Sequence, residues 1–350
     1  MLALVLGVGI IALGHFMKVP WSARFYMLGL LYVAVMALVL VLPEGAFLRR
    51  ALGGSAEPWI VLGLLVVCFV AYRAVLGKVR RHAVQVQTER GDAPPSQHGA
   101  PFNDDELERY ARHITLPEIG GPGQHALKEA KVLVVGAGGL GAPILLYLGA
   151  AGIGRLGIID ADTVALSNLA RQVIHTDGRQ DMPKVFSAQA AIAERNPFVD
   201  IRPYNRLLDE EIAPKLFAEY DLILDGTDTF AARAMVNRAA VQVRKPLISG
   251  AISAWEGQVT IYDPAQNAPC MACIFPVAPD PNQVRTCAET GVIGALPGII
   301  GTMMAAEAIK EITASGRGLR GRMLIYDALH ADARTMNVAR ARDCPVCGNV

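Results

Sequence analysis

Apolar residues are distributed unevenly along this chain of 350 residues. Three nearly uncharged runs, Met1–Met17, Phe25–Leu42 and Trp59–Leu76, lie near the N-terminus, and short charged segments separate them. Each run is near the lower end of the roughly 17–25 residues that a helix needs to cross a bilayer. We therefore expect residues 1–78 to form a membrane anchor of about three transmembrane helices.

Two other structures would also produce such runs. The first run would suit a secretory signal, and the other two would suit a helical hairpin in a buried core. The chain begins MLALVLGVGII, without the leading positive charge of a signal peptide. Lys78, Arg80 and Arg81 follow the third run and favour the cytoplasmic side for that end, although Arg49 and Arg50 weaken this argument. We expect a multi-pass protein of the cytoplasmic membrane, in contact with lipid, whose remaining residues lie in the cytoplasm.

Residues 79–101 differ in composition from the segments on either side. They contain HAVQVQTERGDAPPSQHGA, which is polar and rich in Pro, Gly, Ser and Gln, and which shows no lasting hydrophobic period. Such a composition is typical of a linker. We expect residues 102–350 to form one further domain.

Within residues 102–350, short apolar runs alternate with helical patterns. The runs predicted as strands are KVLVV, RLGIID, DIRPY, DLILDG and KPLISG, and the helices between them include residues 142–151 and 184–195. Continuous apolar strands that alternate with helices are typical of a parallel sheet covered on both faces. The predicted fold class is therefore α/β, with a Rossmann-like doubly wound sheet.

This domain opens on a predicted helix. In NDDELERYARHI, Asn103 is placed to cap the helix, and Glu106 is placed to complete a capping box. Arg109 and Arg112 then lie on one face of that helix.

A glycine-rich turn follows the first predicted strand in VLVVGAGGLG. Gly136, Gly138 and Gly141 match the dinucleotide-binding fingerprint, which combines a tight turn, close approach of a phosphate to the backbone, and close helix packing. The N–H groups at the start of the next helix would face an anion. Asp160 ends the second predicted strand, where a carboxylate can bind a ribose hydroxyl. Taken alone, this motif favours NAD as the ligand.

Polar residues after the second strand favour a different nucleotide. Asn168, Arg171, Gln172 and Lys184 lie there, and a cofactor bound through an intact pyrophosphate does not need them. A nucleotide whose α-phosphate is attacked while pyrophosphate leaves does need them, because Arg and Lys neutralise the negative charge that accumulates. Asp228, in DGTDTF after the fourth strand, is placed to hold Mg²⁺ near the same phosphates.

Together these motifs resemble those of a known family. GAGGLG, DADTVALSNLARQ, PK, DGTD and GVIGALPGIIGTMMAAEAIK are similar to the motifs of the ubiquitin-activating type of adenylyltransferase, above all the molybdopterin-synthase adenylyltransferases and their thiamine-pathway relatives. The resemblance runs from about Leu107 to Gly348. It implies a nucleotidyltransferase that uses ATP to adenylylate the C-terminal Gly-Gly carboxylate of a ubiquitin-like sulfur-carrier protein.

The resemblance also implies which carrier is activated. The expected carrier is the small subunit of molybdopterin synthase, in molybdenum cofactor biosynthesis, and the thiamine-pathway carrier is the alternative. An NAD-dependent oxidoreductase is the alternative from a different class. We expect the sulfur to come from a separate sulfurtransferase. The formal net charge of +1 gives no reason to expect binding to nucleic acid.

The resemblance further implies a role for each residue of the expected site. In this family an arginine from the N-terminal helix of the other subunit reaches the nucleotide, and Arg112 in RYAR matches it, which implies a homodimer. The other implied roles are phosphate-loop contacts at Gly138 and Gly139, a ribose ligand at Asp160, phosphate ligands at Asn168, Arg171, Gln172 and Lys184, and a Mg²⁺ ligand at Asp228.

The implied reaction needs no general base. A terminal carboxyl group has a pKa of about 3.3–3.7, so it is ionised at neutral pH. The difficulty is repulsion between a carboxylate and a polyanion, which cations must overcome. The histidines of the domain agree with this, since none stands in a catalytic motif; we expect surface or hydrogen-bonded core positions for His113, His125, His175 and His330.

Cys270, Cys273, Cys344 and Cys347 form two CxxC pairs. At this spacing, two thiolates hold one side of a tetrahedral Zn²⁺. A redox dithiol and disulfides are the alternatives, but a reducing compartment would favour zinc. We expect such a site to be structural, because four protein ligands leave no open position.

A fifth cysteine of the domain, Cys287, lies in VRTCAETG. The resemblance implies that a cysteine at this place can accept or relay the activated carrier, and Arg285 is close enough in sequence to lower its pKa. An inert loop thiol is the alternative, because adenylylation itself needs no thiol. Cys68 lies inside an apolar run and is expected to face lipid or to be packed.

Overall fold

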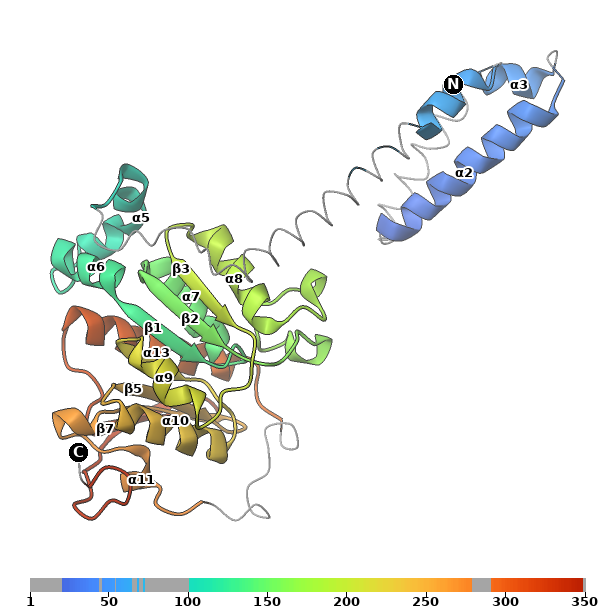
Figure 1. The fold of residues 1–350 in the computed structure, drawn as a ribbon. Coiled ribbons are helices and arrows are strands. Elements are labelled where there is room, and N and C mark those ends of the chain that lie inside the picture. Colours follow the sequence, from blue (N-terminus) through green and yellow to red (C-terminus); the bar gives the residue numbers. More distant parts are fainter. Residues whose placement is uncertain are drawn as a thin grey trace. The chain divides into compact units, whose positions relative to one another are not determined.

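The computed structural model describes residues 21–43, 46–53, 55–64, 68, 72, 101–278 and 291–348. The chain divides into two compact units, Met1–Asp92 and Ala93–Val350 (Figure 1). The division falls within residues 79–101, the predicted linker. Almost all of that segment lies outside the described residues, so the linker stays a prediction.

The first unit contains α2 (Trp21–Val41), α3 (Phe47–Ala51) and a further helical segment at residues 57–64. Its small apolar cluster joins all three, with Leu52 and Trp59 packed against the later part of α2. The buried members of that cluster are Val35, Val39 and Leu52, and its partly buried members are Leu31, Ala56 and Trp59.

The expectation of three transmembrane helices is wrong. Among the helices of the described residues, none is both long enough and apolar enough to span a bilayer, so the expected multi-pass location in the cytoplasmic membrane is also wrong. The run Met1–Met17 lies outside the described residues, and Trp59–Leu76 is described only in part.

The later part of α2 packs against residues near the third apolar run, whereas other apolar residues of α2, such as Leu30, Val33 and Leu40, are exposed. The hydroxyl of Tyr32 donates to the carbonyl oxygen of Trp59 at 2.7 Å, so residues of the second and third apolar runs touch each other. A run of apolar residues suits a helix that packs on another helix as well as one that faces lipid, and hydropathy alone does not separate the two.

The second unit is built on one eight-stranded sheet, in the order β3-β2-β1-β4-β5-β6-β7-β8. The first five strands in that order are parallel, whereas β6, β7 and β8 pair antiparallel with their neighbours. The strands are β1 (Lys131–Val135), β2 (Arg155–Ile159), β3 (Asp200–Tyr204), β4 (Leu222–Asp225), β5 (Leu247–Ile252), β6 (Glu256–Tyr262), β7 (Arg322–Asp327) and β8 (Asp332–Asn337).

Helices cover both faces of this sheet (Figure 1). One apolar core joins the parallel strands to α7, α8 and α13, and a second core lies on the other face against α9, α10 and α11. The prediction of a Rossmann-like α/β sheet is therefore confirmed. The helices of this unit are α5 (Asp104–Ile114), α6 (Gly120–Glu129), α7 (Gly141–Ala151), α8 (Lys184–Arg195), α9 (Ile212–Ala218), α10 (Phe230–Gln242), α11 (Met271–Ile274) and α13 (Ala295–Thr313), with short 3₁₀ turns η1 (Leu166–Asn168), η2 (Asp177–Arg179) and η3 (Pro264–Gln266).

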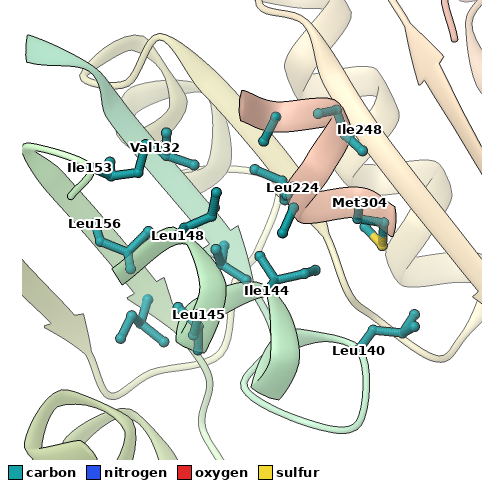
Figure 2. Packing of buried hydrophobic residues seen from close by; sticks show 14 of the residues in the cluster. Val132, Leu140, Ile144, Leu145, Leu148, Ile153, Leu156, Leu224, Ile248 and Met304 are labelled. Carbon is teal, nitrogen blue, oxygen red and sulfur yellow. The ribbon is translucent and has the colours of Figure 1, made fainter. Parts of the chain in front are cut away.

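Figure 2 shows the core that seats α7. Ile144, Leu145 and Leu148 of α7 lie over Val132 of β1 and Leu156 of β2, and all five side chains are fully buried. A buried branched side chain stabilises the fold by about 1.5–3 kcal/mol. This packing fixes the start of α7, and with it the glycine turn that joins β1 to α7.

The strand order places the candidate site. The chain runs outward from β1 to β2 and β3 and then returns to β4 on the other side of β1, so β1 and β4 are neighbours. Their ends are aligned, since Val135 of β1 lies opposite Asp225 of β4. In doubly wound sheets, ligands bind beyond the carboxyl ends of the strands at this change of direction.

Candidate active site

The glycine turn has the geometry that its sequence requires. Gly136 has a φ of +93°, and a Cβ there would lie 3.2 Å from the carbonyl oxygen of Gly226. A Cβ at Gly141 would lie 2.0 Å from the carbonyl oxygen of Gly136, a distance that no side chain tolerates. The turn after β1 and the turn after β4 are therefore in direct contact, and only glycine permits it.

Two backbone donors of the turn have no partner among the described residues. The N–H of Ala137 donates to Oδ2 of Asp160 at 2.7 Å, whereas the N–H groups of Gly138 and Gly139 donate to no atom within the described residues. These two groups precede the N-terminus of α7, a position that favours anions. They are suited to bind phosphate oxygens.

Asp160 directly follows β2, at the carboxyl end of the strand where it was expected. Its carboxylate accepts the N–H of Ala137 through Oδ2 and the N–H of Asp162 through Oδ1, at 2.7 Å and 2.8 Å. Each carboxylate oxygen has a second lone pair. Asp160 therefore orients the glycine turn and keeps acceptor capacity for a ribose hydroxyl.

Lys184 and Arg171 lie beside this turn. Lys184 is the first residue of α8, and its Nζ donates to Oδ2 of Asp162. The backbone N–H of Asp162 donates to the carboxylate of Asp160, which also accepts from the glycine turn. Nη2 of Arg171 donates to Oδ1 of Asn168 at 2.6 Å, and the Arg171 side chain lies close to Gly139. The structure thus places Arg171 beside the glycine turn and links Lys184 to it through Asp162 and Asp160, and their role as phosphate ligands stays a prediction.

Gln172 also lies at the turn. It is only 4% exposed, and its Nε2 lies 3.6 Å from where a Cβ of Gly138 would be. Its Oε1 is buried and has no hydrogen-bond partner among the described residues. Since buried polar atoms are normally satisfied, this oxygen is available to a donor on a ligand.

Helix α13 packs on the same turns. Gly294, just before the helix, lies against the carbonyl oxygen of Ala170, and Gly301 lies against that of Leu140. The motif GVIGALPGIIGTMMAAEAIK therefore includes a helix, and glycines of the motif pack closely on these loops.

The turn after β4 is held by residues that the sequence analysis missed. The carboxylate of Asp225 accepts from the N–H and the hydroxyl of Thr227 at 3.0 Å and 2.7 Å, and the Arg233 guanidinium donates twice to the Thr227 carbonyl, at 3.1 Å and 2.9 Å. Burial raises the pKa of Asp225, while Arg233 and the hydrogen bonds from Thr227 and Ser249 oppose that shift. The sequence signal that could have identified this turn is an Asp followed by a Gly at the end of a predicted strand, here Asp225 and Gly226.

Asp228 follows this clamped turn and is exposed. It is the last residue before Thr229, whose hydroxyl caps α10 by accepting the N–H of Ala232. Its position is therefore fixed on both sides by hydrogen-bonded neighbours, next to the glycine turn.

Two predicted catalytic residues are not brought into this group. Arg112 is exposed on α5, and its side chain has no hydrogen-bond or ion-pair partner in the described part of its own chain. Cys287 lies outside the described residues. The capping box that begins α5 is confirmed, with Asn103 and Glu106 each accepting the other's backbone N–H.

The four cysteines of the two CxxC pairs meet in space. Their Sγ atoms all lie within 4.8 Å of one another, with separations of 3.6 Å for Cys270–Cys344, 3.9 Å for Cys270–Cys273 and 3.4 Å for Cys273–Cys347. A tetrahedral site with Zn–S distances of about 2.3 Å has S···S separations of about 3.8 Å. The four thiols are free, and their arrangement fits a zinc ion.

The chain matches the ThiF family over residues 110–346. It is 45% identical over 249 residues to the sulfur carrier protein adenylyltransferase of Thermus thermophilus, a match that covers 70% of this chain and 92% of that protein. It is 42% identical to the adenylyltransferase and sulfurtransferase MOCS3 of Dictyostelium discoideum, covering 70% of this chain and 58% of that one. The chain therefore spans little more than half the length of this MOCS3 relative.

Solved structures share the fold. Escherichia coli MccB with MccA-N7isoASN has a TM-score of 0.62 at 22% identity, covering 72% of this chain and 77% of that chain. PaaA has a TM-score of 0.59 at 22% identity, covering 80% and 90%. The sequence matches, which are to adenylyltransferases, also decide against an NAD-dependent oxidoreductase. This chain belongs to the ThiF family.

Proposed function

We propose that this chain is an ATP-dependent adenylyltransferase that activates a ubiquitin-like sulfur-carrier protein at its C-terminal carboxylate. The grouping around one turn of Lys184, Arg171 and the N–H groups of Gly138 and Gly139, which have no partner within the described ranges, carries the proposal. The relatives named as sulfur carrier adenylyltransferases support the choice of substrate.

The residues of the site have the following roles. Asp160 binds the ribose, and the N–H groups of the glycine turn bind phosphate oxygens with the help of Asn168, Arg171, Gln172 and Lys184. The amide N–H of Gln172 serves the phosphates, which leaves its buried oxygen for a ligand hydroxyl or N–H. Arg112 of one protomer reaches the nucleotide of its partner in a homodimer.

In the reaction, a carboxylate oxygen of the carrier attacks the α-phosphorus of ATP. The bond from that phosphorus to the bridging oxygen breaks, which gives an acyl-adenylate and pyrophosphate, and no proton is transferred. Arg171 and Lys184 reduce the repulsion between the two anions and neutralise charge on the leaving group. When bound at Asp228, Mg²⁺ would add its positive charge to the phosphates. Zn²⁺, if bound by the four cysteines, would have a structural role, because four protein ligands leave no open position.

The carrier that we propose first is the small subunit of molybdopterin synthase, and the thiamine-pathway carrier is the second candidate. A separate sulfurtransferase supplies the sulfur in either case. A role for Cys287 in accepting the activated carrier stays a prediction.

Pyrophosphate exchange tests this proposal. The full chain is mixed with Mg-ATP, labelled pyrophosphate and each carrier in turn, and incorporation of label into ATP is measured. We expect exchange with one carrier and none after removal of its last glycine. Absence of exchange with both intact carriers would refute the proposed activity, and the ratio of the two rates identifies the carrier.

A further inference from the structure

His175 is buried beneath the glycine turn and takes no part in the roles above. It is 5% exposed and lies in the segment between η1 and η2. Its Nε2 is 2.9 Å from the carbonyl oxygen of Ala137, and its Nδ1 is 2.9 Å from Oγ of Ser187. The imidazole therefore joins the turn to α8, the helix that Lys184 begins.

These two contacts determine where the ring carries its proton. A carbonyl oxygen only accepts, so Nε2 must carry the hydrogen that it donates to Ala137. In the neutral ring Nδ1 is then an acceptor, and the Ser187 hydroxyl donates to it. Burial lowers the pKa of His175, which favours this neutral form.

The contact with Ala137 also fixes a neighbouring group. All peptide bonds of the described residues are trans, so the carbonyl of Ala137 and the N–H of Gly138 point to opposite sides of one planar unit. His175 holds the carbonyl on the buried side. The N–H of Gly138, which has no partner among the described residues, therefore points away from the interior.

The other peptide of Ala137 is held as well. Its N–H donates to Asp160 at 2.7 Å, so both peptide units that flank Ala137 are fixed by buried or partly buried side chains. A second link runs through Ser187, which lies three residues after Lys184 and so on the same face of α8.

We propose that His175 is a positioning residue of the phosphate-binding turn: its Nε2–H holds the Ala137 carbonyl inward, so that the N–H of Gly138 faces the nucleotide phosphates. This inference rests on the proposed function, because it takes the turn to bind ATP. It adds a residue that touches neither substrate but orients one of the donors.

Two amide variants separate the two contacts of the ring. The amide of Gln in His175→Gln reaches as far as Nε2 and can still donate to Ala137, whereas the shorter amide of His175→Asn reaches only as far as Nδ1 and keeps the contact with Ser187. The dissociation constants of Mg-ATP and of adenosine are measured by calorimetry on the full chain, without carrier, and thermal unfolding is recorded for each variant.

We expect His175→Asn to bind ATP about tenfold more weakly, and His175→Gln to stay within about threefold of the wild type, because the lost contact is one buried hydrogen bond. Adenosine, which has no phosphate, should bind equally to all three proteins. Equal ATP affinity of a folded His175→Asn and the wild type would overturn the inference, as would an equal loss in both variants. A merely structural role would lower the unfolding temperature without changing the ratio of the two affinities.

If His175→Asn does not fold, Ser187→Ala tests the same inference. It removes the hydroxyl that donates to Nδ1 of His175, so the ring is free to turn away from Ala137. We then expect ATP affinity to fall by about threefold, and unchanged affinity contradicts the inference. Failure of the proposed function is recognised separately: the wild type would not bind ATP, or would bind it without exchange of pyrophosphate.

Discussion

Nζ of Lys184 lies 2.7 Å from Oδ2 of Asp162, and the two ends of this pair differ sharply in exposure. The Lys184 side chain is 6% exposed, whereas that of Asp162 is 71% exposed. The carboxylate can therefore move into solvent and remain hydrated when a phosphate takes its place. We therefore expect the Lys184 ammonium to keep its position when a nucleotide binds, which would reduce the reorganisation needed on binding.

Replacing this lysine should remove activity but not the fold. We expect Lys184→Met to lower the rate of pyrophosphate exchange on the order of 10³-fold, by analogy with cations in phosphoryl transfer. The unfolding temperature should change little, because methionine fills similar space without a buried charge. Lys215→Met is the matched control, since Lys215 forms an exposed pair with Glu211 on α9. Equal activity of the two variants would contradict the role of Lys184.

Arg112 should act in the site of the other protomer. We expect Arg112→Ala to be impaired, although its side chain has no partner within the described part of its own chain. Mixing it with Lys184→Met under conditions of subunit exchange should restore about one quarter of wild-type activity, because half of the dimers are mixed and each mixed dimer has one intact site.

Arg109→Ala provides the control for this mixing experiment. Arg109 lies on the same helix, but it donates to the carbonyl of Arg195 at 2.6 Å and lies over the ring of Phe198. Its loss should affect stability rather than catalysis. Absence of any recovery on mixing Arg112→Ala with Lys184→Met would argue against a shared site.

The hydrogen bonds that hold the turn after β4 lead us to predict a change in magnesium dependence when Arg233 is replaced. Arg233→Ala removes both donors to the Thr227 carbonyl and a cation that lowers the pKa of buried Asp225. Asp228, the proposed Mg²⁺ ligand, directly follows Thr227 and would lose its fixed position. We therefore expect the Mg²⁺ concentration for half-maximal pyrophosphate exchange to rise by about tenfold. Arg238→Ala, on the same helix and paired with Glu210 at the surface, should leave the Mg²⁺ titration unchanged. A lower rate with the same midpoint would exclude this role.

The cysteine cluster predicts one tightly held zinc ion per chain. Elemental analysis of purified protein should find it, and Cys273→Ser should lose it, with a loss of about 4 kcal/mol or more in the free energy of unfolding. Cys68→Ser is the control, because Cys68 is exposed and lies in the other compact unit. Full zinc content in the Cys273→Ser protein would contradict the assignment.

The lowered pKa of His175 predicts a loss of stability in acid. Burial is its largest cause, Lys184 and Arg179 lower the pKa further, and the Ala137 carbonyl and Asp160 oppose them. Below a pH of about 6.5 the unfolded chain binds a proton on this residue that the folded chain does not, so the free energy of unfolding falls with pH until the folded pKa is reached.

Urea unfolding between pH 7.5 and 5.5 measures this effect. We expect a shallower fall for His175→Gln than for the wild type, while the half-exposed His125→Gln behaves as the wild type. A parallel fall in wild type and His175→Gln would assign the acid sensitivity to other groups.

Local sequence patterns were sufficient to predict the parallel strands of the sheet. The runs KVLVV and RLGIID became β1 and β2, and the glycine fingerprint and the capping box were found where expected, because each depends on residues close in sequence. Strand β8, Asp332–Asn337, could not be predicted in this way, since all of its residues are exposed and it has no apolar period.

Contacts between distant segments were beyond the sequence pattern. Nothing in the sequence pairs His175 with Ala137, or Arg233 with Thr227, because these pairings follow from how the elements pack. The prediction of transmembrane helices from the N-terminal apolar runs was wrong for a related reason. The surroundings of a helix, lipid or protein, are not determined by its own hydropathy. The four cysteines do meet in space, because the short spacing within each pair already brings two thiols together, and the zinc ion itself stays a prediction.

The four-cysteine cluster also has a topological consequence. A metal ion bound by Cys270, Cys273, Cys344 and Cys347 would close a ring of chain that includes α13. Closing a ring removes freedom from the unfolded chain. Gly294, just before α13, and Gly301, within it, abut the loops around the candidate site. If the metal is bound, we expect a chelator or thiol reagent that opens the ring to loosen the proposed ATP site from a distance, and we expect ATP in that site to slow loss of the metal.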